Sequence, residues 1–296
     1  MITPPSLTKG DNIAIVAPAR FIAQEKYESI CSLIQGFGYN PILGETTHLE
    51  NSIFAGSDRD RAADFQAMIN RRDIKAIFCV RGGYGCVRMV EMVDFLPLLS
   101  NPKWVVGFSD ITVLHSAINN CGVESIHGQM PVNFDKPYAA VERIFKLLEG
   151  TSPEYRFVST FNRRGSVEAE VCGGNLSVLC SLMGTRFQQS TYGKILFIED
   201  IGEPLYRIDR MIQHLRVAGV LKNLAGLVCG YFTAIEDTIP SYGCDYRHII
   251  LDAVKEYRYP VAFDFKAGHE HPNLPLIMGR KASLTVEDNS CKFLFT

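Results

Sequence analysis

The first 135 residues alternate between continuous apolar runs and amphipathic segments. Apolar runs at 12–17, 76–80 and 104–108 indicate buried strands, and the segment 25–35 carries apolar residues at helical spacing. Strands that are apolar on both faces need cover on both faces, and helical connections make neighbouring strands parallel. The alternation therefore predicts an α/β domain with a parallel sheet, whose ligand sites lie beyond the carboxyl ends of the strands.

The pattern changes after residue 165. Short strands rich in Val, Leu and Phe alternate with glycine turns, and the clearest helical segment is 207–217. A length of 296 residues also suits two domains of about 150 residues each. We predict an N-terminal α/β domain at 1–135, a linker at 136–165, and a mixed, β-rich α/β domain at 166–296.

Composition narrows the functional class. The net charge is −2 and no basic block occurs, which argues against nucleic acid as a partner. No apolar run reaches the roughly 18 residues that span a membrane, and the N-terminus does not have the pattern of a signal peptide. The nine cysteines are scattered, without a Cys-x-x-Cys pair or zinc spacing, which favours a reducing compartment. We expect a cytoplasmic protein, and the cysteines do not predict a zinc site.

Ser109 stands at a sharp junction between two kinds of pattern. The apolar run Trp104–Gly107 ends just before it, and helical spacing begins at Asp110. A serine at such a junction exposes its Oγ above the sheet edge, and the next backbone N–H faces the same space. This arrangement suits a nucleophile, although a Ser-Asp pair that opens a helix can also serve only as a cap.

A glycine-rich loop, Arg-Gly-Gly-Tyr-Gly at 81–85, follows the apolar run 76–80. Its glycines permit close backbone approach and positive φ. The loop matches neither common nucleotide-binding motif, so a phosphate cradle is disfavoured. It can aim a backbone N–H at a developing oxyanion, or it can be a plain turn.

An acid and a base are the next candidates. The segment 194–200 runs from apolar residues into Glu199 and Asp200, which places a carboxylate at the end of a buried strand. Such a carboxylate can orient a histidine or pair with an arginine, and alternation does not decide which of the two acids faces the site. His269 lies in a loop bounded by glycine and proline and is a candidate base. With His271 it could instead hold a metal, but no third ligand has suitable spacing.

Other interpretations stay open at this point. His127 lies at a strand end and could reach the same space as Ser109, whereas His115 lies inside a helical segment and is expected to be a packing or a surface residue. Cys86 directly follows the glycine loop and offers a cysteine nucleophile. A two-lobed sugar- or peptide-binding protein without catalysis is a further alternative.

Seven short motifs carry a family resemblance, and they occur in this order: Gly-Asp-Asn-Ile-Ala-Ile-Val-Ala-Pro-Ala (10–19), Arg-Gly-Gly-Tyr-Gly (81–85), Gly-Phe-Ser-Asp-Ile-Thr (107–112), His-Gly-Gln-Met (127–130), Gly-Gly-Asn-Leu-Ser (173–177), Ile-Glu-Asp-Ile-Gly-Glu (198–203) and Gly-His-Glu-His-Pro-Asn (268–273). Together they resemble the LD-carboxypeptidase family of serine peptidases, which includes the microcin C self-immunity peptidases. The likeness spans nearly the whole chain.

The resemblance implies a fold and an activity. It implies a flavodoxin/Rossmann-like N-terminal domain and a mixed C-terminal domain, with the active site in the cleft between them. It implies a catalytic triad of Ser109, Glu199 and His269, with no metal and no cofactor. It further implies a homodimer that releases the terminal D-alanine of murein tetrapeptide by cleaving an L-to-D peptide bond during cell-wall recycling in the cytoplasm.

Further residues follow from the mechanism. The oxyanion would lie between the backbone N–H groups of Asp110 and Gly83. A carboxypeptidase also binds a free carboxylate, for which Arg81, Tyr84 and Asn175 are candidates, with loop packing or turn stabilisation as their alternative roles.

The alternative within the family is a microcin-type immunity peptidase, which cleaves an amide in a nucleotide-peptide conjugate. It would need an aromatic platform for the base. The single tryptophan, Trp104, falls in an expected core strand, which argues mildly against this alternative.

Overall fold

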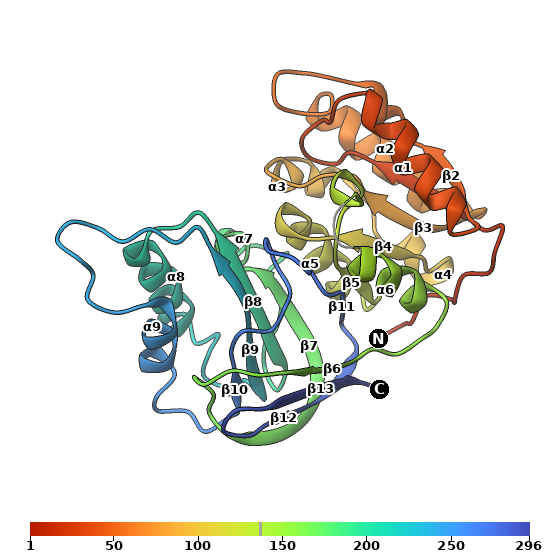
Figure 1. The fold of residues 1–296 in the computed structure, drawn as a ribbon. Coiled ribbons are helices and arrows are strands. Elements are labelled where there is room, and N and C mark those ends of the chain that lie inside the picture. Colours follow the sequence, from red (N-terminus) through yellow and green to blue (C-terminus); the bar gives the residue numbers. More distant parts are fainter. Residues whose placement is uncertain (136–137) are drawn as a thin grey trace. The chain divides into compact units, whose positions relative to one another are not determined.

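The computed structural model describes residues 1–135 and 138–296, and Figure 1 shows the course of the chain. The chain forms two compact units, each built from two segments. Unit 1 comprises Met1–Thr151 and Leu274–Gly279, and unit 2 comprises Ser152–Asn273 and Arg280–Thr296.

Unit 1 contains a six-stranded sheet with the order β11-β5-β4-β3-β1-β2. Its strands are β1 (Asn12–Val16), β2 (Asn40–Leu43), β3 (Ile74–Cys79), β4 (Trp104–Gly107), β5 (Ser125–His127) and β11 (Leu276–Met278). Neighbours from β2 to β5 pair in parallel, and β11 pairs antiparallel with β5. Strands β4 and β5 are wholly buried, and β1 and β3 each have one residue that is not, as expected for a sheet covered on both faces.

Helices alternate with these strands along the chain (Figure 1). They are α1 (Glu25–Gly36), α2 (Asp58–Asn70), α3 (Cys86–Met89), α4 (Pro97–Ser100), α5 (Thr112–Asn120) and α6 (Tyr138–Leu148), with the 3₁₀ turns η1 (Glu45–His48), η2 (Val90–Met92), η3 (Ser109–Ile111) and η4 (Pro131–Asn133). The alternation of strands and helices that the sequence predicts is confirmed.

Unit 2 contains a seven-stranded mixed sheet with the order β10-β9-β8-β7-β12-β13-β6. Its strands are β6 (Glu154–Phe157), β7 (Gly165–Asn175), β8 (Ile195–Ile201), β9 (Gly226–Thr233), β10 (Val261–Ala262), β12 (Lys281–Val286) and β13 (Cys291–Phe295). Strands β7 to β10 are parallel and the other pairs are antiparallel. The parallel half therefore gathers the carboxyl ends of β7 and β8 at one edge of the sheet.

Three helices complete unit 2, namely α7 (Leu176–Ser181), α8 (Leu205–Val217) and α9 (Tyr246–Ala253). Ile208 and Ile212 of α8 and Ile250 of α9 share one buried cluster with Leu196 and Ile198 of β8. This cluster packs against one face of β8 and supports its carboxyl end.

The boundary between the units differs from the predicted linker at 136–165. The helix α6 belongs to unit 1, where Phe145 stacks on Phe37 with ring centroids 3.9 Å apart, whereas β6 belongs to the sheet of unit 2. Strand β11 also belongs to unit 1, although its residues lie within the predicted C-terminal domain. An amphipathic helix buries its apolar face wherever a core accepts it, and chain order does not show which core that is.

Within the described residues, no helix is both long and apolar enough to cross a membrane. All nine cysteines of the sequence are described, and each of them is free of a disulfide.

Candidate active site

Ser109 occupies the turn that leads from β4 into η3 and α5. Its φ of +64° lies in the left-handed region, which residues other than glycine rarely adopt. Phe108 and Asp110 are each only 4% exposed, whereas Ser109 between them is partly exposed. Backbone strain of this kind costs on the order of 1–3 kcal/mol and clusters at functional positions. The predicted strand-to-helix turn is present, and it holds the serine at the surface.

The glycine loop packs directly against this turn. A Cβ added to Gly82 would lie 3.3 Å from Ser109 Cβ and 3.4 Å from the backbone nitrogen of Asp110. Gly83 has a φ of +104°, and a Cβ there would lie 2.7 Å from Arg20 Cδ. The structure thus identifies Gly82 as the glycine nearest the serine, which spacing alone did not distinguish. The N–H groups of Asp110 and Gly83 stay the predicted oxyanion donors.

Two buried charged groups hold the loop in place. The Asp110 carboxylate accepts a hydrogen bond from the Cys86 N–H at 2.9 Å, and burial raises the pKa of this carboxyl. Arg61 is fully buried and donates to the carbonyl oxygens of Pro18 at 2.7 Å and Gly85 at 2.8 Å. Arg61 is not among the residues predicted from the sequence. The sequence does contain an indication of its burial, because Arg61 shares a helix face with the apolar residues Phe65 and Met68.

Two histidines of unit 1 are structural. His115 is fully buried, with Nε2 2.8 Å from the Gly107 carbonyl oxygen and Nδ1 2.9 Å from Ser125 Oγ. Because burial lowers the pKa of His115 to about 4, the ring is neutral and donates to the carbonyl through Nε2. It bonds to the end of β4 just before Ser109, so of the two expected roles, packing and surface, the structure shows packing. His127 is also fully buried and contacts the Phe108 ring, with centroids 5.8 Å apart.

In unit 2, Glu199 and His269 form a hydrogen-bonded pair. Glu199 is fully buried in β8, and its Oε2 accepts a hydrogen bond from His269 Nδ1 at 2.7 Å. Burial favours a lower pKa for His269, but the hydrogen bond and charge of Glu199 and the charge of Asp200 outweigh it, so the net shift raises the pKa. This geometry leaves Nε2 of the imidazole as the nitrogen that can exchange a proton with a substrate or nucleophile.

The loop that carries His269 is shaped by its neighbours. Gly268 has a φ of +124°, and a Cβ there would lie 2.8 Å from Glu199 Oε2. Its N–H donates to Asn273 Oδ1 at 2.9 Å, and Asn273 is fully buried. Only glycine lets the backbone approach the carboxylate this closely. Asn273 was missed as a supporting residue, although it closes the motif that contains His269.

Asn175 has a structural role in unit 2. It is 3% exposed and caps α7, its Oδ1 accepting from the Val178 N–H at 3.2 Å. Its Nδ2 donates to Asp200 Oδ1 at 2.9 Å. The structure thus shows the turn-stabilising role that the sequence analysis gave as an alternative, and a substrate contact by Asn175 stays a prediction.

The other candidates of unit 1 divide by exposure. Arg81 is partly buried and donates from Nη1 to the Phe21 carbonyl oxygen at 3.2 Å, and Tyr84 is 45% exposed. Both can present polar groups to a ligand.

Cys86 is fully buried, and burial raises the pKa of its thiol well above the usual range. A buried thiol of this kind is a poor nucleophile, which disfavours the cysteine-hydrolase interpretation.

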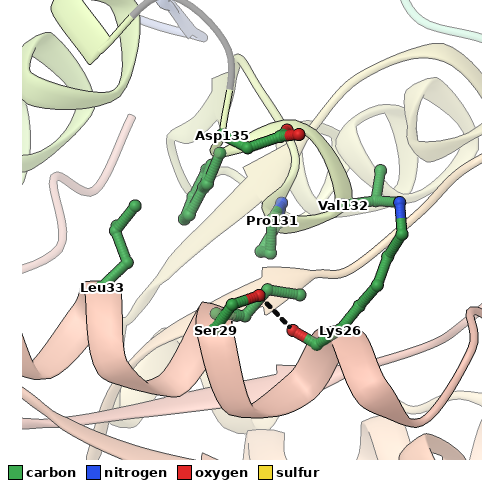
Figure 2. Close-up of a pocket in the computed structure, with 8 residues that line it drawn as sticks. Lys26, Ser29, Leu33, Pro131, Val132 and Asp135 are labelled. Atoms are coloured by element: carbon green, nitrogen blue, oxygen red, sulfur yellow. Dashed lines mark hydrogen bonds between the residues drawn. The ribbon is translucent and has the colours of Figure 1, made fainter.

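A pocket of about 140 Å³ lies elsewhere in unit 1, between α1 and the η4 segment (Figure 2). Lys26 and Asp135 put opposite charges on an otherwise largely apolar lining that includes Leu33 and Pro131. Ser29 in this pocket donates its hydroxyl to the Lys26 carbonyl oxygen at 2.9 Å. None of the predicted site residues lines it.

The predicted site residues therefore form two groups, each described within its own unit. Ser109 and Asp110 lie together in unit 1, with Gly82 of the glycine loop against them, and Glu199 and His269 lie together in unit 2. Across residues 1–135 and 138–296, no three His, Cys, Asp or Glu side chains are grouped as metal ligands.

Comparison with protein families gives matches in both units. Residues 13–128 match the LD-carboxypeptidase N-terminal domain, and residues 168–284 match the LD-carboxypeptidase C-terminal domain. The Bacillus subtilis (strain 168) protein named "Probable murein peptide carboxypeptidase" is 33% identical over 97% of this chain and 92% of its own length. The Escherichia coli microcin C7 self-immunity protein is 24% identical over 96% of this chain and 93% of its own length.

Solved structures show the same fold. The crystal structure of muramoyltetrapeptide carboxypeptidase from Oxalobacter formigenes is similar, with a TM-score of 0.89 and 27% identity. The match covers 96% of this chain and 98% of that one.

Proposed function

Because this chain belongs to the LD-carboxypeptidase family of peptidases, we propose that it is a serine carboxypeptidase that releases the terminal D-alanine of murein tetrapeptide. The observation that carries the proposal is the 2.7 Å hydrogen bond between the buried Glu199 carboxylate and His269 Nδ1. A carboxylate in this position fixes the tautomer of a general base, as in serine peptidase triads.

The proposed reaction proceeds by acyl transfer. His269 Nε2 takes the hydroxyl proton of Ser109 as Oγ attacks the carbonyl carbon of the L-to-D peptide bond. Glu199 stabilises the imidazolium that results, and the N–H groups of Asp110 and Gly83 stabilise the oxyanion. His269 then gives the proton to the leaving nitrogen, D-alanine departs, and water hydrolyses the acyl-enzyme by the same route.

Recognition of the substrate carboxylate is assigned to unit 1. Arg81 and Tyr84 lie in the glycine loop beside Ser109, and guanidinium and hydroxyl groups both suit a terminal carboxylate. Asn175 is a weaker candidate, because its amide already bonds to Asp200 and Val178. We further propose that the protein works in the cytoplasm as a homodimer, without a metal or other cofactor.

A microcin-type activity on a nucleotide-peptide conjugate is the second candidate, since the E. coli self-immunity protein is a relative. Such a substrate needs an aromatic platform for its base. Trp104 is 3% exposed, and its indole N–H donates to the Pro5 carbonyl oxygen at 3.1 Å, so it is not available as a platform. This favours the murein peptide.

Mass spectrometry of products tests the proposal. Incubation with murein tetrapeptide should yield the tripeptide and free D-alanine, and the isomer with L-alanine at the terminus should stay intact. Hydrolysis of an aminoacyl nucleotide conjugate with no cleavage of the tetrapeptide would favour the second candidate instead.

A further inference from the structure

A second carboxylate is buried directly beside Glu199. Asp200 is 1% exposed, and its oxygens accept three hydrogen bonds of 2.9 Å each, from Asn175 Nδ2, the Ile201 N–H and the Ser177 N–H. No lysine or arginine pairs with it in the part of the chain that the structure describes. The charge of Asp200 is therefore held by neutral donors alone.

This arrangement costs stability at neutral pH. Burial and the neighbouring charge of Glu199 raise the pKa of Asp200 to about 6, although its three hydrogen bonds oppose the shift. A carboxyl group whose pKa is higher in the folded state contributes most stability below its unfolded pKa, and that contribution is lost as pH rises through about 6. Buried charges that destabilise a fold are typical of functional sites.

The groups around Asp200 show where its charge acts. Asn175 at the end of β7 is neutral, and Phe232 of β9 pairs with Asp200 across the sheet. Cys180 of α7 is not ionised, because burial and the charge of Asp200 raise the pKa of its thiol to about 12. The titratable neighbours that remain are Glu199 and, through it, His269. The charges of Glu199 and Asp200 are the two that act on His269, and both favour its protonated form.

We propose that Asp200 is a positioning residue for the general base, which fixes the carboxyl ends of β7 and β8 and supplies a second negative charge beside the Glu199–His269 pair. This inference rests on the proposed function. Asp200 accepts hydrogen bonds from Asn175 Nδ2 and the Ser177 N–H, which hold its carboxylate in place beside Glu199. Asp200 stabilises the imidazolium that forms when His269 accepts the proton of the nucleophile.

A direct titration of His269 tests this role. In Asp200→Asn, the pKa of His269 measured by NMR of the imidazole should fall by about 0.5 unit or more, less than the 1–3 units that a directly contacting charge produces. The acid limb of kcat/KM should move to lower pH by the same amount, with KM unchanged. Asp245→Asn is the matched control, because Asp245 likewise accepts a hydrogen bond from an N–H in the first turn of a helix of unit 2, but does not act on His269. An unchanged pKa of His269 in folded Asp200→Asn would overturn the inference.

A second variant covers the case in which Asp200→Asn does not fold. Asn175→Ala removes a donor that lowers the pKa of Asp200, so Asp200 should be partly protonated near pH 7 and the pKa of His269 should again fall. A folded Asn175→Ala protein with an unchanged His269 pKa contradicts the inference equally.

The titration needs no substrate. A shifted pKa in a protein that does not cleave murein tetrapeptide therefore rejects the proposed function alone, and cleavage with an unchanged pKa rejects the role of Asp200 alone.

Discussion

Ser109 of unit 1 and Glu199 of unit 2 lie near the carboxyl ends of parallel strands, but the two units hold their functional residues by different means. In unit 1, Ser109 is held by the backbone, through its φ of +64° and the close approach of Gly82. In unit 2, His269 is held by charge, through the buried Glu199 with Asp200 beside it. A nucleophile depends on the position of its attacking atom, whereas a general base depends on its pKa. We therefore expect unit 1 to be sensitive to chain geometry and unit 2 to be sensitive to charge and pH.

The largest expected effect comes from removing the nucleophile. Ser109→Ala should lower kcat by about 10⁴-fold or more, as in other serine triads, with the fold retained. Kinetics on murein tetrapeptide and circular dichroism measure the two properties. A variant that kept more than about a tenth of the rate would show that Ser109 is not the nucleophile, since tenfold is only about 1.4 kcal/mol.

Removing the charge of Glu199 should have the next largest effect. Glu199→Gln keeps the volume of the side chain but removes the charge that stabilises the imidazolium, so kcat should fall by up to about 10⁴-fold with little change in KM. Because Glu199 raises the pKa of His269, the acid limb of kcat/KM should move to lower pH. A pH–rate profile measures both changes. An acid limb that stayed in place would separate Glu199 from the base.

A smaller effect should follow from displacing the pair without changing its charge. The added Cβ of Gly268→Ala meets Glu199 Oε2, so we expect a loss of about 10- to 100-fold in kcat. Gly219→Ala is the matched control, because Gly219 also has positive φ, at +76°, but an added Cβ there meets nothing within 4 Å. Equal losses of kcat in the two variants would mean that backbone strain, rather than the position of Glu199, is responsible.

The smallest effect concerns stability in unit 1. Glycine adopts a φ of +64° without the steric cost that a Cβ brings, so Ser109→Gly should be more stable than Ser109→Ala by about 1 kcal/mol. Urea denaturation of the two inactive proteins measures this difference. Equal stabilities would show that the turn at Ser109 is not strained.

Local features of the fold and site were predictable from the sequence. The apolar spacing at 25–35 corresponds to α1 at Glu25–Gly36, and the junction after Trp104–Gly107 is the turn that carries Ser109. Each depends on residues that are close in the chain, where periodicity and turn chemistry act directly.

Long-range features were not predictable. Strand β11 has only three residues, and it pairs with β5 about 150 positions earlier in the chain, which no local pattern indicates. Strand alternation left the choice between Glu199 and Asp200 open for a different reason. Strand β8 lies inside the sheet and is buried from Ile195 to Asp200, so both carboxylates are buried and alternation does not separate them. The register of β8 against β9 also shifts between Ile198 and Asp200.

The central claim is that Ser109 of unit 1 and the Glu199–His269 pair of unit 2 serve one reaction. The most direct measurement is the rate at which a fluorophosphonate labels the protein, with the modified residue located by mass spectrometry. We predict that Ser109 alone is labelled in the wild type, and that His269→Ala slows this labelling by at least about 100-fold, the lower end of what a general base contributes. Labelling of another residue, or a Ser109 labelling rate that His269→Ala leaves unchanged, would contradict the account.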